Sequence, residues 1–393
     1  MTVSDTAPTS RLLTRKFVLV VITASVYAVG IGSLNALVPP FVVDELDGSE
    51  ATAGVVMGSA AVTALCSRAI WGRVGDRYGA RRLVGVGAAI VGFSLLILLV
   101  WPTVAGVLTM RLVMGAGSAA FFVGTSLRSI ELAPDNRRSQ AAAFNLTAFH
   151  VGMGLGPFGG EWVLATWSYD VTWMVVAALS FTGCALSWLL TAVPGDPDAT
   201  PSPAVHRAAI GPAVVTLFGV FGFNGYLIFA ALYADEIGLS EVGPVFMVSS
   251  GTMIVTRLLF GRLPDVIGPV RAGTGALLVT TGATTLMALW NEPVGLYVGA
   301  ATLALGLSMQ SPSFMVIAID RVPERERASA MATYTASFDL ASALSGPVLG
   351  VIAATSGFRA AFLVAAALSL VALALLRIRV APHWSPLDNR LPG

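Results

Sequence analysis

Six ionisable side chains interrupt stretches of this chain that are otherwise apolar and long enough to cross a membrane. Burying a charge at the centre of a bilayer costs at least about 2.5–3.5 kcal/mol, so such residues usually serve an ion or substrate pathway. Carboxylates and imidazoles can bind and release protons, and a guanidinium can hold an anion. The set therefore predicts proton transfer and substrate binding inside a membrane. Its members are Arg68, Arg111, His150, Glu161, Arg257 and Asp339.

Asp339 and His150 have the same setting. Each lies about ten residues, or roughly 15 Å along a helix, from the cytoplasmic start of its apolar stretch, which is near the membrane midplane. Each shares a helix face with small residues, Gly346 for Asp339 and Gly154 for His150. Asp339 is therefore the first candidate for the proton carrier and His150 the second. The alternatives are a structural or arginine-paired carboxylate, and a packing or substrate-binding histidine. Glu161 lies near the outer face, where an entrance or interface role is favoured over proton carriage.

The remaining charged and polar residues are candidates for substrate contact or for loop structure. Arg111 lies in the outer half of its stretch and could bind an anionic group, tune a carboxylate or satisfy helix carbonyls. Arg68 and Arg257 lie about one turn before charged loops, so they are expected in those cytoplasmic networks rather than at the substrate site. Polar lining of the cavity, or single hydrogen bonds between helices, is predicted for Asn35, Asn224, Tyr226 and Gln310.

The composition of the chain predicts that these residues lie in segments that span a membrane. The 393 residues are 55% hydrophobic and 11% charged, whereas soluble proteins carry roughly 25% charged residues. This excludes disorder, a coiled coil and an ordinary cytosolic enzyme, and the net charge of +1 gives no case for nucleic acid. Continuous apolar stretches without alternation predict helices rather than barrel strands. Twelve are expected, near 17–43, 53–72, 83–101, 103–129, 140–166, 172–193, 210–234, 243–261, 272–290, 294–319, 329–355 and 359–378.

Arginines and lysines concentrate in alternate loops and at both ends of the chain. Cytoplasmic loops carry this excess of cations, so both termini are predicted to be cytoplasmic, with the protein in the cell (inner) membrane. The Pro-rich stretch 194–209 is too polar to span. It is interpreted as a cytoplasmic linker between a six-helix bundle at 1–193 and a second at 210–393.

The two halves repeat one another. One offset of 189 residues aligns many positions, including His150 with Asp339 and Arg68 with Arg257, and two six-helix halves of the same orientation predict a substrate site at their interface. The same offset aligns Gly72-Arg73 with Gly261-Arg262, Asp76 with Asp265, Gly79 with Gly268 and Arg82 with Arg271.

These repeated segments resemble a known family. GRVGDRYGARR (72–82) is similar to the loop signature of the major facilitator superfamily, and GRLPDVIGPVR (261–271) to its degenerate second copy. RLVMGAGSAA (111–120) resembles the fourth-helix motif. GMGLGPFGG (152–160) resembles the fifth-helix motif of drug:proton antiporters, although Glu161 stands where that pattern has a glycine. The resemblance covers the whole chain and implies the all-α, twelve-helix fold of that family.

The resemblance also implies a conformational latch, in which the loop cluster contacts the eleventh helix and holds the outward-facing state. The residues assigned to it are Gly72, Arg73, Asp76, Arg77, Gly79, Arg82 and Asp265, with Arg68 and Arg257 beside them. The Gly-Pro pairs Gly156-Pro157 and Gly346-Pro347 weaken the hydrogen bonds of their helices and are predicted hinges.

The sequence therefore predicts a secondary transporter, driven by protons, that exports small organic molecules by alternating access. A proton-coupled importer or a uniporter would use the same scaffold, and a non-transporting membrane sensor is less favoured. No nucleotide-binding loop, zinc-peptidase motif or nucleophile elbow occurs, so neither an enzyme nor a cofactor is expected. The expected partners are a small-molecule substrate, protons and the bilayer, and the protein is expected to be a monomer.

Overall fold

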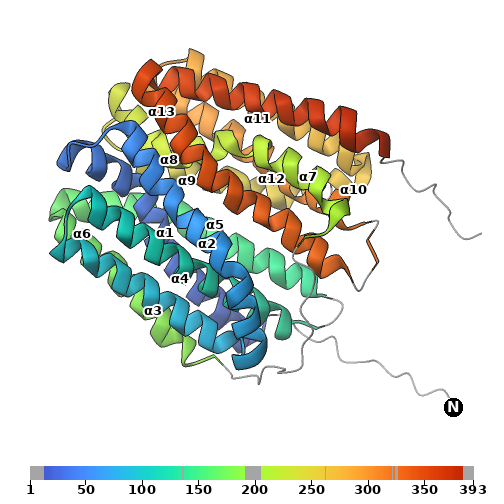
Figure 1. Cartoon of the computed structure of the whole chain (residues 1–393), viewed down its shortest axis with the longest axis horizontal. Helices are drawn as coiled ribbons and strands as arrows, with labels where there is room; N and C mark the ends of the chain where they lie inside the picture. Colours follow the sequence, from blue (N-terminus) through green and yellow to red (C-terminus); the bar gives the residue numbers. More distant parts are fainter. Residues whose placement is uncertain are drawn as a thin grey trace, which may run out of the picture.

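The computed structural model describes residues 13–134, 137–190, 205–261, 263–320, 322–323 and 326–383. Within these residues all regular structure is helical. Figure 1 shows two groups of helices lying side by side, α1 to α6 in one and α7 to α13 in the other. The all-α class predicted from the sequence is confirmed.

The first bundle contains six long helices, four of which begin at a side-chain cap. The side-chain oxygens of Thr14, Ser49, Thr103 and Ser168 each accept a hydrogen bond from a backbone N–H in the first turn that follows, which satisfies a donor that has no partner within the helix. The helices are α1 (Arg15–Pro40), extended by the π-helical turn η1 (Phe41–Glu45), α2 (Glu50–Tyr78), α3 (Ala80–Val100), α4 (Val104–Glu131), α5 (Arg138–Thr166) and α6 (Tyr169–Ser187).

The second bundle covers its six predicted spans with differently divided helices. The span predicted at 210–234 is interrupted at Val220, and the last two spans form one bent element. Its elements are α7 (Arg207–Gly219), α8 (Phe221–Glu236), α9 (Gly243–Phe260), α10 (Leu263–Ile267), α11 (Pro269–Leu289), α12 (Pro293–Ile319), α13 (Arg327–Leu375), η4 (Leu376–Val380) and η5 (Ala381–His383).

The lengths of these helices suit a multi-pass membrane protein. Ten segments of the described chain are long and apolar enough to cross a membrane. The segment at 329–380 counts once but holds two of the predicted spans, because Gly357 bends α13 with a φ of 82°. Helix α5 is not one of these ten segments, but its 29 residues are enough to cross a membrane, and it packs against α1. The structure therefore agrees with the predicted twelve-helix fold. Residues 191–204 lie outside the described chain, so the limits of the linker stay a prediction.

Two repeat-equivalent glycines shape the same turn in each half. Gly79 ends α2 with a φ of 82°, and Gly268 precedes α11 with a φ of 88°. A side chain at either position would be strained, because this region of φ favours glycine. We refer to the end of the protein that holds these two turns as the motif end. The far end is the opposite one, where α5 ends and α9 begins.

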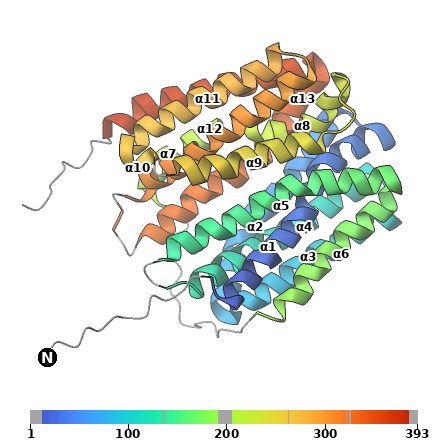
Figure 2. The same ribbon diagram turned by 180° about the vertical axis from the view of Figure 1, so that it is seen from behind.

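The halves meet mainly along two helix pairs, α2 with α13 and α5 with α9, and α1 also contacts α8. Figure 2 shows α5 running beside α9. On the other pair, a Cβ atom added to Gly54 of α2 would overlap the carbonyl group of Gly346 in α13, and one added to Gly346 would overlap that of Gly54. Backbone therefore packs directly on backbone at the far end, as is common where membrane helices associate.

The Gly-Pro pairs lie within continuous helix in this conformation. Pro157 is inside α5 and Pro347 is inside α13, and Gly156 packs closely against Val29 and Ser33 of α1. In the described residues, the helices of the second half are instead interrupted at Val220 and bent at Gly357. Hinge motion at Gly156-Pro157 and Gly346-Pro347 stays a prediction.

Two substitutions in α2 test the contact of Gly54 with α13, one at the contact and one away from it. We expect Gly54→Val to lower the free energy of unfolding by about 1–3 kcal/mol, because the added side chain forces two backbones apart. Gly72→Val on the same helix should have little effect, since a Cβ there meets nothing within 4 Å. Thermal unfolding of the purified proteins in detergent measures both, and equal losses of stability would contradict the packing argument.

Candidate functional site

Asp339 forms an ion pair between the two halves. Its Oδ2 lies 2.5 Å from Nη2 of Arg68, which joins α13 to α2. Asp339 is about 18 Å along its helix from the motif end and Arg68 about 15 Å, so the pair lies near mid-depth. The side chains are 17% and 27% exposed, so the protein does not completely enclose either of them.

Arg68 was expected in the cytoplasmic loop network, and its position in the structure differs. Helix α2 continues to Tyr78 rather than ending near residue 72. Arg68 is therefore ten residues inside the helix, far enough from the loop to reach α13 at the depth of Asp339. Pairing with an arginine was one of the alternatives for Asp339, but the sequence did not indicate which arginine.

A second contact between the halves occupies the equivalent place in the repeat. Nη1 of Arg257 in α9 lies 3.3 Å from Nδ1 of His150 in α5. The same Nδ1 lies 2.7 Å from the carbonyl oxygen of Leu146, one turn earlier in α5. Arg257, like Arg68, thus contacts the opposite half rather than only its own loop. The offset of 189 residues relates both members of this pair to those of the first.

A small cavity of about 70 Å³ lies beside His150, between α5, α8 and α9. It is larger than a single water requires. Apart from His150 its lining is aromatic and aliphatic, with two hydroxyl groups. The sequence identified only His150 among these residues, because phenylalanines and methionines at helical spacing look the same on a cavity wall and on a lipid face. The others are Phe149, Met153, Phe223, Leu227, Phe246, Ser249, Ser250 and Met253.

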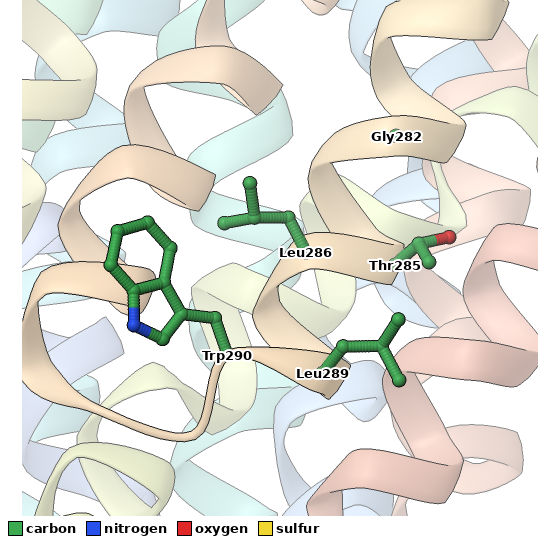
Figure 3. A pocket seen from close by; sticks show the side chains of 5 residues that line it. All are labelled: Gly282, Thr285, Leu286, Leu289 and Trp290. Atoms are coloured by element: carbon green, nitrogen blue, oxygen red, sulfur yellow. The ribbon is translucent and has the colours of Figure 1, made fainter.

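A larger depression, of about 520 Å³, lies away from these polar residues. Figure 3 shows that its lining comes from the last turns of α11, including Leu286, Leu289 and Trp290. One helix end supplies the whole lining and no charged group contributes to it. The smaller cavity at the junction of the halves is therefore the better candidate for a substrate site.

Glu161 connects the halves at the far end. Its Oε1 accepts a hydrogen bond from the N–H of Val242 (3.0 Å), and its Oε2 accepts one from the N–H of Gly243 (2.7 Å). These amides start α9, where N–H groups lack partners within the helix and the helix dipole favours a negative charge. The carboxylate of α5 thus caps a helix of the other half. Glu161 thus lies at the interface between the halves, near the far end.

The other polar candidates mostly satisfy neighbouring helices. Arg111 is buried and donates to the carbonyl oxygen of Met57 at 2.9 Å, which corresponds to the structural alternative considered for it. Asn35 contacts Met153 Sδ at 3.9 Å, and Asn224 accepts from Ser342 at 3.4 Å.

Tyr226 and Gln310 are almost completely enclosed. The hydroxyl of Tyr226 donates to Ser249 at 3.0 Å, and the amide of Gln310 has no partner among the described residues. Neither residue lines the cavity beside His150, and the same holds for Arg111, Asn35 and Asn224.

The proposed latch residues lie at the motif end. The guanidinium groups of Arg77 and Arg82 lie 5.5 and 5.8 Å from the ring centre of Tyr78, and Arg73 is in the same last turns of α2. The side chains of Asp76 and Asp265 are outside the described part of the structure. The latch therefore stays a prediction. Arg128 is a further charged residue that was not predicted; it is buried in α4 and pairs with Glu131 at 2.7 Å. Its position inside the apolar stretch 103–129 was the available signal.

Comparison with known proteins identifies the family. A sequence model of the Major Facilitator Superfamily matches residues 20–294 and 241–393. The chain belongs to this superfamily. An uncharacterised MFS-type transporter of Pseudomonas aeruginosa is 31% identical over 389 residues, covering 92% of each chain. Another from Salmonella typhimurium is 27% identical over 368 residues, covering 90% of this chain and 93% of the relative.

Solved structures share the fold of this major facilitator protein. The nucleoside transporter NupG superposes with a TM-score of 0.76 at 14% identity, covering 92% of this chain and 99% of NupG. The human organic anion transporter MFSD10 gives a TM-score of 0.70 at 18% identity, covering 92% and 98%. Family and fold together support a secondary transporter embedded in a membrane through many passes.

The carboxylate cap at the far end predicts a local change in backbone protection. We expect Glu161→Ala to accelerate hydrogen exchange at the amides of Val242 and Gly243 by about ten- to hundredfold, since each loses a hydrogen bond to a charged group. Hydrogen–deuterium exchange with mass spectrometry measures this at the start of α9. Glu241→Ala is the control, because that carboxylate is adjacent but makes neither bond. Equal rates in the two variants would refute the cap.

Proposed function

We propose that the protein is a proton-coupled exporter of small organic molecules and that Asp339 carries the proton. The observation that supports this most directly is the ion pair of Asp339 with Arg68. It unites a titratable carboxylate, a contact between the two halves and a position near mid-depth. Proton binding at this one atom changes the attraction between the halves, which is what coupling to alternating access requires.

The proposed step follows from the charges in the pair. When Asp339 Oδ2 is deprotonated, it compensates the guanidinium of Arg68 and holds α13 against α2. When it takes up a proton, the carboxyl becomes neutral and Arg68 loses its counter-ion. A charge without a partner in the membrane is costly, so the paired arrangement loses its advantage and the halves can move apart. Release of the proton restores the contact.

The proposed direction depends on the orientation in the membrane. Cations gather at the motif end, which favours a cytoplasmic position for that end. The far end, where Glu161 and the packing of Gly54 on Gly346 join the halves, would then face outward. The cavity beside His150 would load from the cytoplasm. Export is further favoured by the resemblance of segment 152–160 to the antiporter motif.

Lumenal pH in reconstituted vesicles tests this proposal and its direction of coupling. Vesicles loaded with a pH-sensitive dye receive members of a library of organic amphiphiles on the outside. An antiporter moves protons outward as substrate enters, so the lumen should become alkaline. An importing symporter would acidify the lumen, and a uniporter would leave its pH unchanged. Either of these results would overturn proton-coupled export.

A separate variant tests whether Asp339 carries the proton. We expect Asp339→Asn to abolish the pH response while exchange of labelled substrate across the vesicle membrane continues, because exchange needs no net proton movement. Asp170→Asn, which neutralises an exposed carboxylate at the start of α6, should behave as wild type. A full pH response in Asp339→Asn would show that another group carries the proton.

A further inference from the structure

The two contacts between the halves occupy equivalent positions but differ in charge. Arg68 faces a carboxylate, Asp339, at 2.5 Å. Arg257 is its repeat equivalent and faces an imidazole, His150, at 3.3 Å. A single difference in side-chain type therefore leaves one arginine with a counter-ion and the other without one. Among the described residues no carboxylate oxygen lies within 4 Å of Arg257, and its only polar partner is His150.

The histidine cannot replace the missing carboxylate. Its Nδ1 lies 2.7 Å from the Leu146 carbonyl oxygen and 3.3 Å from the Arg257 guanidinium. The nitrogen must carry a proton to donate to the carbonyl and must lack one to accept from the arginine, so it can satisfy only one of them. The shorter contact favours donation to Leu146. In either tautomer the imidazole brings no negative charge, and the charge of Arg257 remains uncompensated.

Arg257 does not itself line the cavity, but it lies one turn beyond the lining on the same face of α9. Phe246, Ser250, Met253 and Arg257 follow one another at intervals of four, three and four residues, which places them on one face of α9. The first three line the cavity, and His150 lines it from α5. The guanidinium therefore lies at the motif end of a mostly apolar wall, next to the only ionisable residue in the lining.

We propose that Arg257 is the anion-binding residue of the substrate site and that the substrates are organic anions with an aromatic or aliphatic body. The anionic group, such as a carboxylate, would take the place at Arg257 that Asp339 occupies at Arg68. The body would lie against Phe149, Phe246 and Met253. This inference rests on the proposed transport function, because it assigns a substrate class to the same site.

The apolar wall distinguishes an organic anion from an inorganic one. A chloride ion could neutralise Arg257, but it would gain nothing from phenylalanine and methionine side chains. An aromatic carboxylate gains from both, because burial of its ring adds to the charge-assisted hydrogen bonds at the guanidinium. A neutral amide of the same shape retains the ring contact and loses the charge.

Binding to the purified full-length protein in detergent, without any gradient, tests the proposal. The probes are 2-naphthoate, 2-naphthamide and chloride, measured by isothermal titration calorimetry. We expect 2-naphthoate to bind about ten- to hundredfold more tightly than 2-naphthamide, as hydrogen bonds to a charged group imply. Arg257→Gln should remove this preference. Equal affinities in the wild type, no binding of the carboxylate, or competition by chloride at equal concentration would each overturn the assignment.

Two substitutions at one position separate charge from shape. His150→Asp gives Arg257 the counter-ion that Arg68 already has, so 2-naphthoate binding should fall at least about tenfold further than in His150→Asn, which has nearly the same shape without the charge. Asp170→Asn serves as the unaffected control. A monodisperse size-exclusion peak and an unchanged unfolding temperature show that each variant is folded. Equal losses in His150→Asp and His150→Asn would refute the proposal.

These measurements can fail independently of the proposed function. If vesicles show an alkaline pH response that depends on Asp339 but Arg257 gives no preference for anions, only the substrate class is wrong. If the anion preference holds and no proton movement occurs, the coupling assignment is wrong and the binding site stands.

Discussion

A charge inside a bilayer must find its partner within the protein, and this constraint governs the interface between the two halves. Water cannot be relied on to solvate a guanidinium at mid-depth, so Arg68 and Arg257 each reach across to the opposite bundle. Toward the far end of the α2–α13 contact, Gly54 and Gly346 bring the two backbones directly together. Such packing has little chemical specificity of its own. The few polar contacts therefore determine which relative positions of the bundles are stable.

The described contacts divide the interface by depth. At the far end Glu161 caps α9 with two hydrogen bonds, and α2 lies directly on α13. Near mid-depth, Arg68 forms a partly exposed ion pair with Asp339, and Arg257 contacts His150. A group that water can reach can exchange a proton, whereas the backbone contact at Gly54 cannot respond to pH. The titratable side chains of the interface, Asp339 and His150, therefore lie nearer the level of the cavity than the backbone contact does.

The sequence predicted most of the fold and only part of the site. Hydropathy located the twelve spans because each is a local property of some twenty residues, and the repeat predicted the relation between the halves. The pairs Arg68–Asp339 and Arg257–His150 were not predicted, since each depends on contact between helices far apart in the chain. The placement of Arg68 also failed because α2 extends past the last apolar residue to Tyr78. The residues of the cavity wall were not predicted, because its phenylalanines have the same spacing as lipid-facing ones.

The correspondence between the two arginine pairs also bears on how such a protein can change over time. Duplication of a six-helix unit gives two copies of the same contact. Each half contributes one residue to each copy. Replacing Asp by His, or the reverse, at one of the two positions alters a single interface and leaves the other intact. One pair can thus be held constant while its twin drifts, so a duplicated scaffold can acquire new ligands without rebuilding the contact that keeps its halves in register.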